Sequence, residues 1–285
     1  MTGQIFKIHA NAYYVYTKED NLVKKYSARG LLKLKKQELV VGDFVEVNDN
    51  AITKVIERKN LFIRPSVANV DLMVCVLSCV PEPDLVLIDK LLVNAELSDI
   101  EKIIVVNKTE LDGELFNKIK EQYKDAKVEI FAVSAKENLG IDELKDKIRG
   151  KFCVFAGQSA VGKTSLVNTI LNLELKTGEV SEKIGRGKHT TTYSQIYEGD
   201  GLKIIDSPGF AILDAFITLE DLRNCYPEFL HLQNDCKFRM CSHTSEPDCA
   251  IKKAVEENKI SKERYSRYVV IYNELKEKGK LYGKY

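Results

Sequence analysis

The chain has 285 residues, of which 44% are hydrophobic and 30% charged, and its formal net charge is +1. This composition is typical of a soluble globular protein, and at roughly 150 residues per domain the length predicts two or three domains. No apolar run has the length of a signal peptide or of a membrane helix, which excludes a membrane-spanning protein and predicts a cytoplasmic one. We expect the seven cysteines to be thiols or metal ligands rather than disulfides.

Residues 1–62 contain short alternating apolar runs between turn residues, at Ile5–Ile8, Tyr13–Tyr16, Asp43–Val47 and Ile52–Ile56. About five strands in sixty residues predict a small β-barrel of the oligonucleotide-binding (OB) type. The segment has eleven basic and seven acidic side chains. With the nearby tyrosines, this excess favours an RNA-contacting surface. The alternative is a solvated basic face over a tyrosine-rich core.

Residues 63–215 alternate between apolar strands and helical spacing. Buried strands are predicted at Val70–Leu77, Ile103–Val106, Val128–Ser134, Phe152–Ala156 and Leu202–Ile205, with a helix at Leu85–Leu97. This alternation predicts a doubly wound α/β domain. Because such domains bind ligands at the carboxyl ends of their strands, the residues directly after each strand are the candidates for a binding site.

The segment Gly157–Thr164 matches the phosphate-loop pattern G-x-x-x-x-G-K-[ST], with a predicted strand before it and helical spacing after it. A chance glycine turn does not explain that context. Backbone N–H groups and the helix dipole are expected to surround a polyphosphate, with Lys163 at its terminal phosphates and the Thr164 hydroxyl on Mg²⁺. The candidate phosphate-binding residues are Gly157, Gln158, Ser159, Ala160, Val161, Gly162, Lys163, Thr164 and Ser165.

Two further loops follow predicted strands and resemble the guanine-reading loops of GTPases. The first resembles N-K-x-D and consists of Asn107, Lys108, Thr109 and Glu110. Its carboxylate can accept hydrogen bonds from the N1–H and amine of guanine but not from adenine. Glu110 stands where Asp is usual, which keeps this chemistry but loosens its geometry. The second loop, whose backbone is expected to meet the guanine carbonyl, consists of Ser134, Ala135 and Lys136.

Two polar segments after the phosphate loop are predicted to sense the γ-phosphate. Gly185–Thr192 is punctuated by glycines and able to hinge, and one of its threonines is expected to give Mg²⁺ a second hydroxyl; Thr191 and Thr192 are the candidates. The turn Asp206–Gly209 reads D-S-P-G. Asp206 is expected at the Mg²⁺ shell and the Gly209 amide at the γ-phosphate.

Residues 216–285 are predicted to form a mainly helical zinc-binding domain. Four candidate ligands have the spacing C-x4-C-x-H-x5-C: Cys236, Cys241, His243 and Cys249. Three thiolates and an imidazole make a closed tetrahedral set, as in a structural zinc site, although unrelated thiols are the alternative. Ten basic side chains follow against five acidic ones. We expect this helical tail to contact rRNA, the alternative being a solvated helix face.

The order of these motifs is unusual, because both base-reading loops precede the phosphate loop. A circularly permuted GTPase domain between a barrel and a Cys/His cluster, with the segments GRGKHTTT and DSPGF, resembles the RsgA/YjeQ/YloQ family of ribosome-small-subunit-dependent GTPases. The resemblance implies a late-acting assembly factor that binds the small ribosomal subunit and its rRNA and hydrolyses GTP to GDP with Mg²⁺ when the subunit stimulates it. It also implies one structural zinc ion. We expect a monomer with no membrane partner.

The residue that orients the attacking water is open. Ras-type enzymes have a Gln directly after the D-x-x-G glycine, but Phe210 occupies that position and cannot hydrogen-bond a water. The resembled family has a histidine proposed to be catalytic at the position of His189, so His189 is the candidate with Lys163; the alternative is that it packs or contacts rRNA.

Two other functions compete with a ribosome-stimulated GTPase. One is a nucleotide-gated RNA-binding module with incidental turnover. The other is a P-loop kinase or ATPase, which leaves the two base-reading loops, the barrel and the metal cluster unexplained. The permuted order also runs the Asp206–Phe210 turn straight into the C-terminal region, so a shift of this turn can pull on that region.

Overall fold

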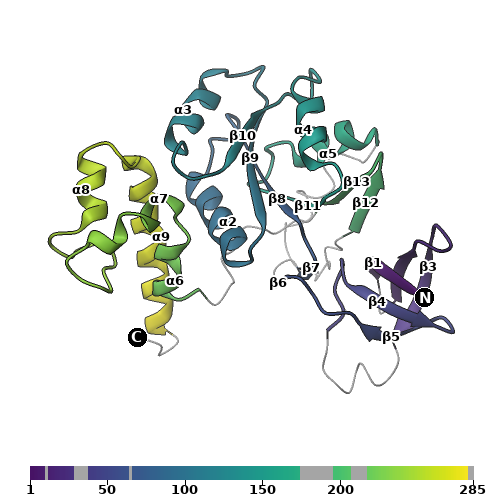
Figure 1. The fold of residues 1–285 in the computed structure, drawn as a ribbon. Helices are drawn as coiled ribbons and strands as arrows, with labels where there is room; N and C mark the ends of the chain where they lie inside the picture. Colours follow the sequence, from purple (N-terminus) through teal and green to yellow (C-terminus); the bar gives the residue numbers. More distant parts are fainter. Residues whose placement is uncertain (10–11, 29–37, 64–65, 174–194, 207–216, 282–285) are drawn as a thin grey trace.

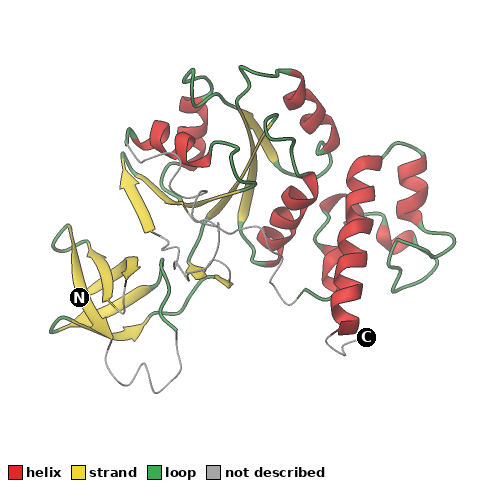
Figure 2. Cartoon of the chain, turned by 180° about the vertical axis from the view of Figure 1, so that it is seen from behind, coloured by secondary structure: helices red, strands yellow, loops and turns green. Residues whose placement is uncertain are grey.

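The computed structural model describes residues 1–9, 12–28, 38–63, 66–173, 195–206 and 217–281. These residues form an N-terminal barrel, a central α/β layer structure and a C-terminal group of helices (Figure 1). Both views place the barrel and the C-terminal helices on opposite sides of the central sheet (Figures 1 and 2). No helix in the described part of the chain is long and apolar enough to cross a bilayer.

The N-terminal barrel has five strands, which confirms the predicted architecture. They are β1 (Thr2–His9), β2 (Ala12–Thr17), β3 (Leu22–Ala28), β4 (Phe44–Asn48) and β5 (Ala51–Val55). Their order is β1-β2-β3-β5-β4, and β4 pairs again with β1, which closes the barrel. Ile5, Val15, Val45 and Ile52 fill its interior. The sequence runs did not single out β3, because most of its side chains are exposed and it lacks an alternating pattern.

The central sheet is parallel except at one edge. It consists of β8 (Leu72–Ser78), β9 (Glu101–Asn107), β10 (Glu129–Ala132), β11 (Phe152–Ala156), β12 (Gln195–Gly199) and β13 (Leu202–Asp206). The order is β10-β9-β8-β11-β13-β12, and only β12 is antiparallel to its neighbour. The carboxyl ends of five strands therefore meet at one edge, as predicted. A short hairpin of β6 (Leu61–Ile63) and β7 (Ser66–Ala68) lies between barrel and sheet.

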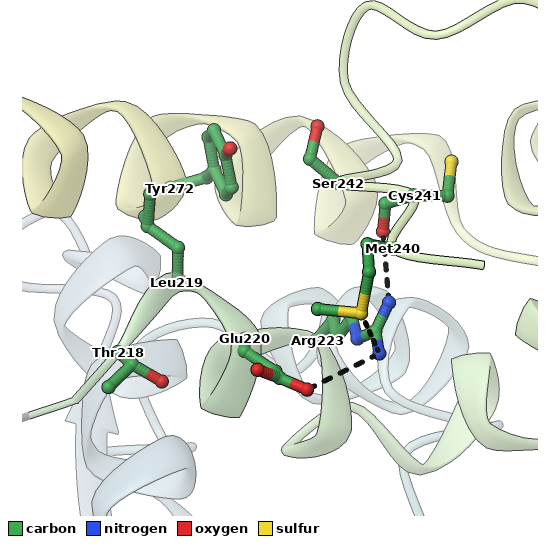
Figure 3. Close-up of a pocket in the computed structure, with 8 residues that line it drawn as sticks. All are labelled: Thr218, Leu219, Glu220, Arg223, Met240, Cys241, Ser242 and Tyr272. Carbon is green, nitrogen blue, oxygen red and sulfur yellow. Dashed lines mark hydrogen bonds and ion pairs between the residues drawn. The ribbon is translucent and has the colours of Figure 1, made fainter. Parts of the chain in front are cut away.

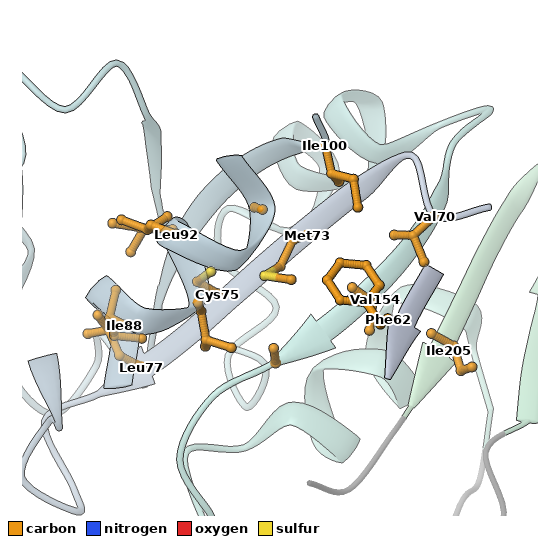
Figure 4. Packing of buried hydrophobic residues seen from close by; sticks show 14 of the residues in the cluster. Phe62, Val70, Met73, Cys75, Leu77, Ile88, Leu92, Ile100, Val154 and Ile205 are labelled. Atoms are coloured by element: carbon orange, nitrogen blue, oxygen red, sulfur yellow. The ribbon is translucent and has the colours of Figure 1, made fainter. Parts of the chain in front are cut away.

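Helices cover both faces of this sheet. They are α2 (Leu85–Leu97), α3 (Glu114–Gln122), α4 (Ile141–Ile148) and α5 (Lys163–Leu171). Alternate residues of β8 face opposite sides of the sheet. Met73, Cys75 and Leu77 pack with α2 (Figure 4) and with α3, whereas Leu72, Val74 and Val76 pack with α4 and α5. All seven residues of β8 are buried. This two-sided burial explains why the strand reads as a continuous apolar run.

The C-terminal region is helical, as predicted. It contains α6 (Leu219–Asn224), α7 (Pro227–Leu230), the 3₁₀ turn η2 (Gln233–Asp235), α8 (Ala250–Glu256) and α9 (Lys262–Leu281). In its own hydrophobic core the rings of Tyr226 and Phe229 stack on each other, and Tyr268 meets both edge to face. The long helix α9 packs beside α2 of the central layer (Figures 1 and 2), which joins the C-terminal helices to the α/β part of the molecule.

The barrel meets the central sheet through β1, which pairs with β12 at Lys7 and Gln195. One side chain from the central sheet supports this junction. The Lys203 ammonium lies 5.3 Å from the ring centroid of Phe6 and 5.5 Å from that of Tyr16, and the two rings stack on each other. Cation–π attraction therefore adds to the short backbone pairing at this boundary.

Candidate functional site

The phosphate loop runs from the end of β11 to the start of α5 and needs glycine at two positions. The φ angles of Gly157 and Gly162 are +142° and +92°. A Cβ atom would lie 2.1 Å from the Val76 carbonyl oxygen at the first position and 2.4 Å from the Asn107 amide nitrogen at the second. Because Gly162 is also the N-cap of α5 and provides no side-chain cap, the helix presents its first backbone N–H groups to the loop, as an anion site requires.

Lys163 lies over this loop. Its ammonium donates hydrogen bonds to the carbonyl oxygens of Gly157 at 2.9 Å and Gln158 at 2.6 Å. Ser159 and Ala160 are exposed at the loop surface, whereas Val161 is buried beneath it. Thr164 and Ser165 lie half-buried in the first turn of α5. The loop thus collects a cation, backbone N–H groups and hydroxyl side chains at one helix terminus.

Asn107, at the end of β9, connects the phosphate loop to both predicted base-reading loops. It is buried, its amide donates to the Val161 carbonyl at 2.9 Å, and its amide oxygen accepts from the Ala135 N–H at 3.2 Å. The neighbouring Lys108 donates to the Ala160 carbonyl at 2.8 Å and to the Val80 carbonyl at 2.6 Å. The three loops therefore form one hydrogen-bonded unit at the carboxyl edge of the sheet.

The remaining base-loop residues leave a carboxylate open to solvent. Thr109 donates to the Val133 carbonyl at 3.0 Å, and the Ser134 hydroxyl accepts from the Glu137 N–H at 3.0 Å. Glu110 is exposed, and its pKa lies below the usual value, chiefly because the Ser134 hydroxyl hydrogen-bonds the carboxylate. Lys136 is exposed beside Glu137. An ionised acceptor next to a polar backbone loop can bind a ring that presents N–H donors.

Asp206 ends β13, and its register partner across the sheet is Phe155 of β11, two residues before the phosphate loop. The strand order thus brings this position to the same edge as the other motifs. The Asp206 side chain lies outside the described part of the structure. So do His189, Thr191, Thr192 and Gly209.

The four predicted metal ligands converge. Their ligand atoms all lie within 4.8 Å of one another. The Cys236 sulfur lies 3.6 Å and the Cys249 sulfur 3.4 Å from His243 Nδ1, and the two sulfurs are 3.9 Å apart. Tetrahedral zinc, with bonds of about 2.3 Å to sulfur and about 2.0 Å to nitrogen, needs spacings of roughly 3.5–3.8 Å. The cluster can therefore hold zinc, with Nδ1 as the histidine ligand.

Side chains that the sequence did not single out hold the metal-ligand loop. The Glu246 carboxylate accepts from the backbone N–H groups of Ser242 at 2.8 Å and Thr244 at 3.3 Å. From α9, the Tyr265 and Tyr268 hydroxyls donate to the carbonyls of His243 and Ser242, both at 2.7 Å. The three-residue spacing of the tyrosines places them on one helix face, but nothing in the sequence names their partners.

Arg223 supports the same loop from α6. Its guanidinium donates to the carbonyl oxygens of Arg239 at 3.2 Å and Cys241 at 3.5 Å. Around it lies a pocket of about 410 Å³ between α6, the segment Met240–Ser242 and Tyr272 of α9 (Figure 3). Arg223 thus fixes the backbone between the first two metal ligands, in addition to the contacts that Tyr265 and Tyr268 make near His243.

The structure corrects one expectation about the basic tail. Arg264 and Arg267 were counted with the charge facing rRNA, but both are buried. Each forms an ion pair with Asp89 of α2. A charge that is paired inside the protein is unavailable to phosphates, so these two arginines belong to the packing of α9 rather than to an RNA surface.

Comparisons with known proteins agree with this arrangement. Two family models match, the RsgA N-terminal domain over residues 2–54 and the RsgA GTPase over residues 55–216. The chain is 39% identical to the small ribosomal subunit biogenesis GTPase RsgA of Caldanaerobacter subterraneus subsp. tengcongensis, covering 98% of this chain and 97% of the relative. It is 40% identical to the protein of that name from Clostridium botulinum, covering 96% and 97%.

Solved structures extend the likeness to the fold. YjeQ from Thermotoga maritima matches with a TM-score of 0.82 at 35% identity, over 96% of this chain and 98% of that one. YloQ, described as a circularly permuted GTPase, matches with a TM-score of 0.76 at 29% identity, over 97% and 95%. Because the family models match residues 2–54 and 55–216 and relatives of 39% and 40% identity match almost the whole chain, the chain belongs to the RsgA GTPase family.

Proposed function

We propose that this protein hydrolyses GTP to GDP and phosphate during late maturation of the small ribosomal subunit, and that the subunit stimulates the reaction. The observation that carries the proposal is the hydrogen-bonded unit at the sheet edge, in which Asn107 joins the phosphate loop to both base-reading loops. The names of the full-length relatives support the subunit as its site of action. The alternative is a nucleotide-gated RNA-binding module with incidental turnover.

In this proposal each loop binds a different part of the nucleotide. Lys163 stabilises the charge of the terminal phosphates, and Thr164 and Asp206 hold Mg²⁺, which neutralises charge that develops on the phosphate oxygens. Thr191 or Thr192 and the Gly209 amide respond to the γ-phosphate. The second base loop meets the guanine carbonyl through its backbone. Glu110 accepts from guanine, which explains the polar exposed position of its carboxylate.

The flanking regions serve as attachment surfaces for rRNA. We propose three domains, residues 1–62, 63–215 and 216–285, acting in a monomer in the cytoplasm. A structural zinc ion held by Cys236, Cys241, His243 and Cys249 rigidifies the third of them. Support comes from the spacing of the four ligand atoms and from the positive charge of the barrel and the tail, less the two buried arginines.

We propose His189 as the group that orients or deprotonates the attacking water, because Phe210 cannot. In this proposal, docking on the subunit brings Gly185–Thr192 to the γ-phosphate, where the neutral form of the His189 imidazole can orient or deprotonate a water. The variant His189→Ala should then bind GTP and the subunit normally but lose most of the stimulated hydrolysis. If it is stimulated as strongly as the wild type, a ribosomal group must supply the function instead.

The central test is the GTPase rate with and without purified small subunits. A large stimulation supports the assembly-factor function, whereas an unchanged slow rate with tight subunit binding favours the RNA-binding module. Competition of ATP against GTP for the site decides the remaining alternative. A kinase or ATPase would prefer ATP, but a carboxylate that has to pair with N–H donors leaves adenine weakly bound.

A further inference from the structure

A buried charge cluster lies where α9 packs against α2. It consists of Asp89, Gln122, Tyr123, Glu228, Arg264 and Arg267, together with the ring of Tyr226. Asp89 is 1% exposed and accepts from both arginines, at 2.6 Å from Arg264 and 2.5 Å from Arg267. One carboxylate of the central layer thus binds two cations of the C-terminal region.

Both arginines of this buried charge cluster have further partners. Arg264 also pairs with Glu228 of α7, and Arg267 donates to the Gln122 side chain at the end of α3, at 2.9 Å. The rings of Tyr123 and Tyr226 flank the Arg264 guanidinium at 4.9 and 4.7 Å. Because separating a buried ion pair leaves uncompensated charges, moving α9 away from α2 at this cluster is strongly unfavourable. It therefore fixes α2 to α9.

The first turn of the same helix contacts the phosphate loop. The Asp84 side chain caps α2 by accepting from the Leu87 N–H at 2.9 Å. The Asp84 N–H in turn donates to the Gln158 side chain, at 3.1 Å. Gln158 is the second residue of the phosphate loop, and Asp84 lies five residues before Asp89 in the chain. About one and a half turns of α2 therefore connect the nucleotide loop to the buried charge cluster.

We propose that Asp89 and Arg267 are positioning residues for the phosphate loop: they hold α2 against the C-terminal region, and α2 holds Gln158. The C-terminal helices then support the nucleotide site through α2, without contacting the nucleotide themselves. This route is separate from the Asp206–Phe210 turn, because it runs through a helix that precedes the phosphate loop in sequence. The inference rests on the proposed nucleotide binding.

Coupling of this kind is reciprocal. If the position of α9 changes the affinity of the loop for nucleotide, nucleotide binding must stabilise α9 by the same factor. Removing the Arg267 side of the cluster should weaken GDP binding about fivefold, at the lower end of typical coupling between sites. A role confined to the stability of the C-terminal region predicts no such change in a folded variant.

The test is a double-mutant cycle read out as the dissociation constant of Mg²⁺–GDP. Arg267→Met keeps the Arg264–Asp89 pair and the apolar packing of the stem. Gln158→Ala removes the contact with α2. We expect each single variant to weaken GDP binding, and Arg267→Met to have no further effect once Gln158→Ala is present. Additive effects of the two substitutions would overturn the proposal.

The matched control is Lys90→Gln. Lys90 pairs with Glu274 at 2.5 Å and so joins the same two helices, but its partner Glu274 is exposed, and an ion pair with a solvent-exposed partner contributes little. It should leave GDP affinity unchanged, and a loss equal to that of Arg267→Met would overturn the role of the buried charge cluster.

Hydrogen exchange of α9 gives a second measurement that needs no substitution in the cluster. In the wild-type full chain, GDP should slow exchange in α9, and in Gln158→Ala this protection should disappear. Absence of protection in a wild type that binds GDP, or unchanged protection in Gln158→Ala, would contradict the coupling. Failure of the wild type to bind GDP would instead contradict the proposed function.

Discussion

At the scale of single residues, Lys163 provides the positive charge for the terminal phosphates in the proposed reaction. Its ammonium is held by two loop carbonyls that an incoming phosphate can replace. Replacing it with alanine removes the point charge for the terminal phosphates, so Lys163→Ala should lower hydrolysis roughly 10²–10³-fold and weaken GTP binding while the circular-dichroism spectrum stays unchanged. Near-normal turnover of a folded variant would show that another group supplies this charge.

Because His243 is a proposed metal ligand, we expect acid to weaken metal binding at this site. Burial lowers its pKa to about 4, whereas an unfolded histidine titrates near about 6.5. The unfolded state therefore takes up the proton first, and the stability of the region falls as the pH drops from about 6.5 to about 4. Protons also compete with metal for the thiolates, in the same direction.

A zinc-sensitive dye should therefore detect release as the pH is lowered through this window, with little release above about pH 7. The free energy of unfolding of the C-terminal helices should fall in parallel. Retention of all the metal at pH 4 would contradict the predicted acid sensitivity of the site.

At the scale of structural elements, the metal-ligand loop depends on more than its ligands. The segment between η2 and α8 has little regular secondary structure, so bound metal supplies much of its folding energy. Cys241→Ala should release zinc, measured by elemental analysis, and raise amide exchange in this segment. GTP binding should persist, weakened by no more than about tenfold through α2. Protein purified without chelator that contains no zinc would contradict the prediction.

Which elements the sequence predicts depends on burial. The strands β8 and β11 and the helix Leu85–Leu97 were predicted closely because their apolar side chains face a core. The edge strand β12 and the exposed β3 were missed, since such strands carry no clear period, and the hairpin β6–β7 was missed because three residues per strand are too few to show one. Site residues were predicted where a motif fixes their spacing to a strand end, as for Asn107 and Gly157.

The residues that the sequence could not assign have partners far away in the chain. Arg264 contacts Asp89 across 175 positions, and within α9 it looks like one more basic residue of a charged helix. Tyr265 donates to a carbonyl inside the metal-ligand loop, a contact that depends on how two elements pack. Side-chain partners set by tertiary packing leave no local pattern to read.

At the scale of the whole molecule, one side chain of the central sheet contacts the barrel. Lys203 lies over Phe6 and Tyr16 and is within hydrogen-bonding distance of Gln4 at 3.4 Å. Lys203→Ala should lower the free energy of unfolding by about 0.5–1 kcal/mol, the usual value of a partly exposed cation–π contact. Small-angle scattering should also show a wider spread of barrel orientations. Lys54→Ala, which removes an exposed ion pair within the barrel, is the control and should change neither measurement.

The sheet order has a consequence for synthesis of the chain. β11 lies between β8 and β13, yet translation makes β8, β9 and β10 first. At 5–20 residues per second, roughly 4–15 s separate the end of β8 from the start of β11. Throughout that interval the nascent half-sheet exposes the unpaired edge of a strand that is fully buried in the finished protein, which is the kind of edge that pairs with other chains. Bound nucleotide cannot stabilise the half-sheet in this interval, because the phosphate loop that binds it has not yet been synthesised.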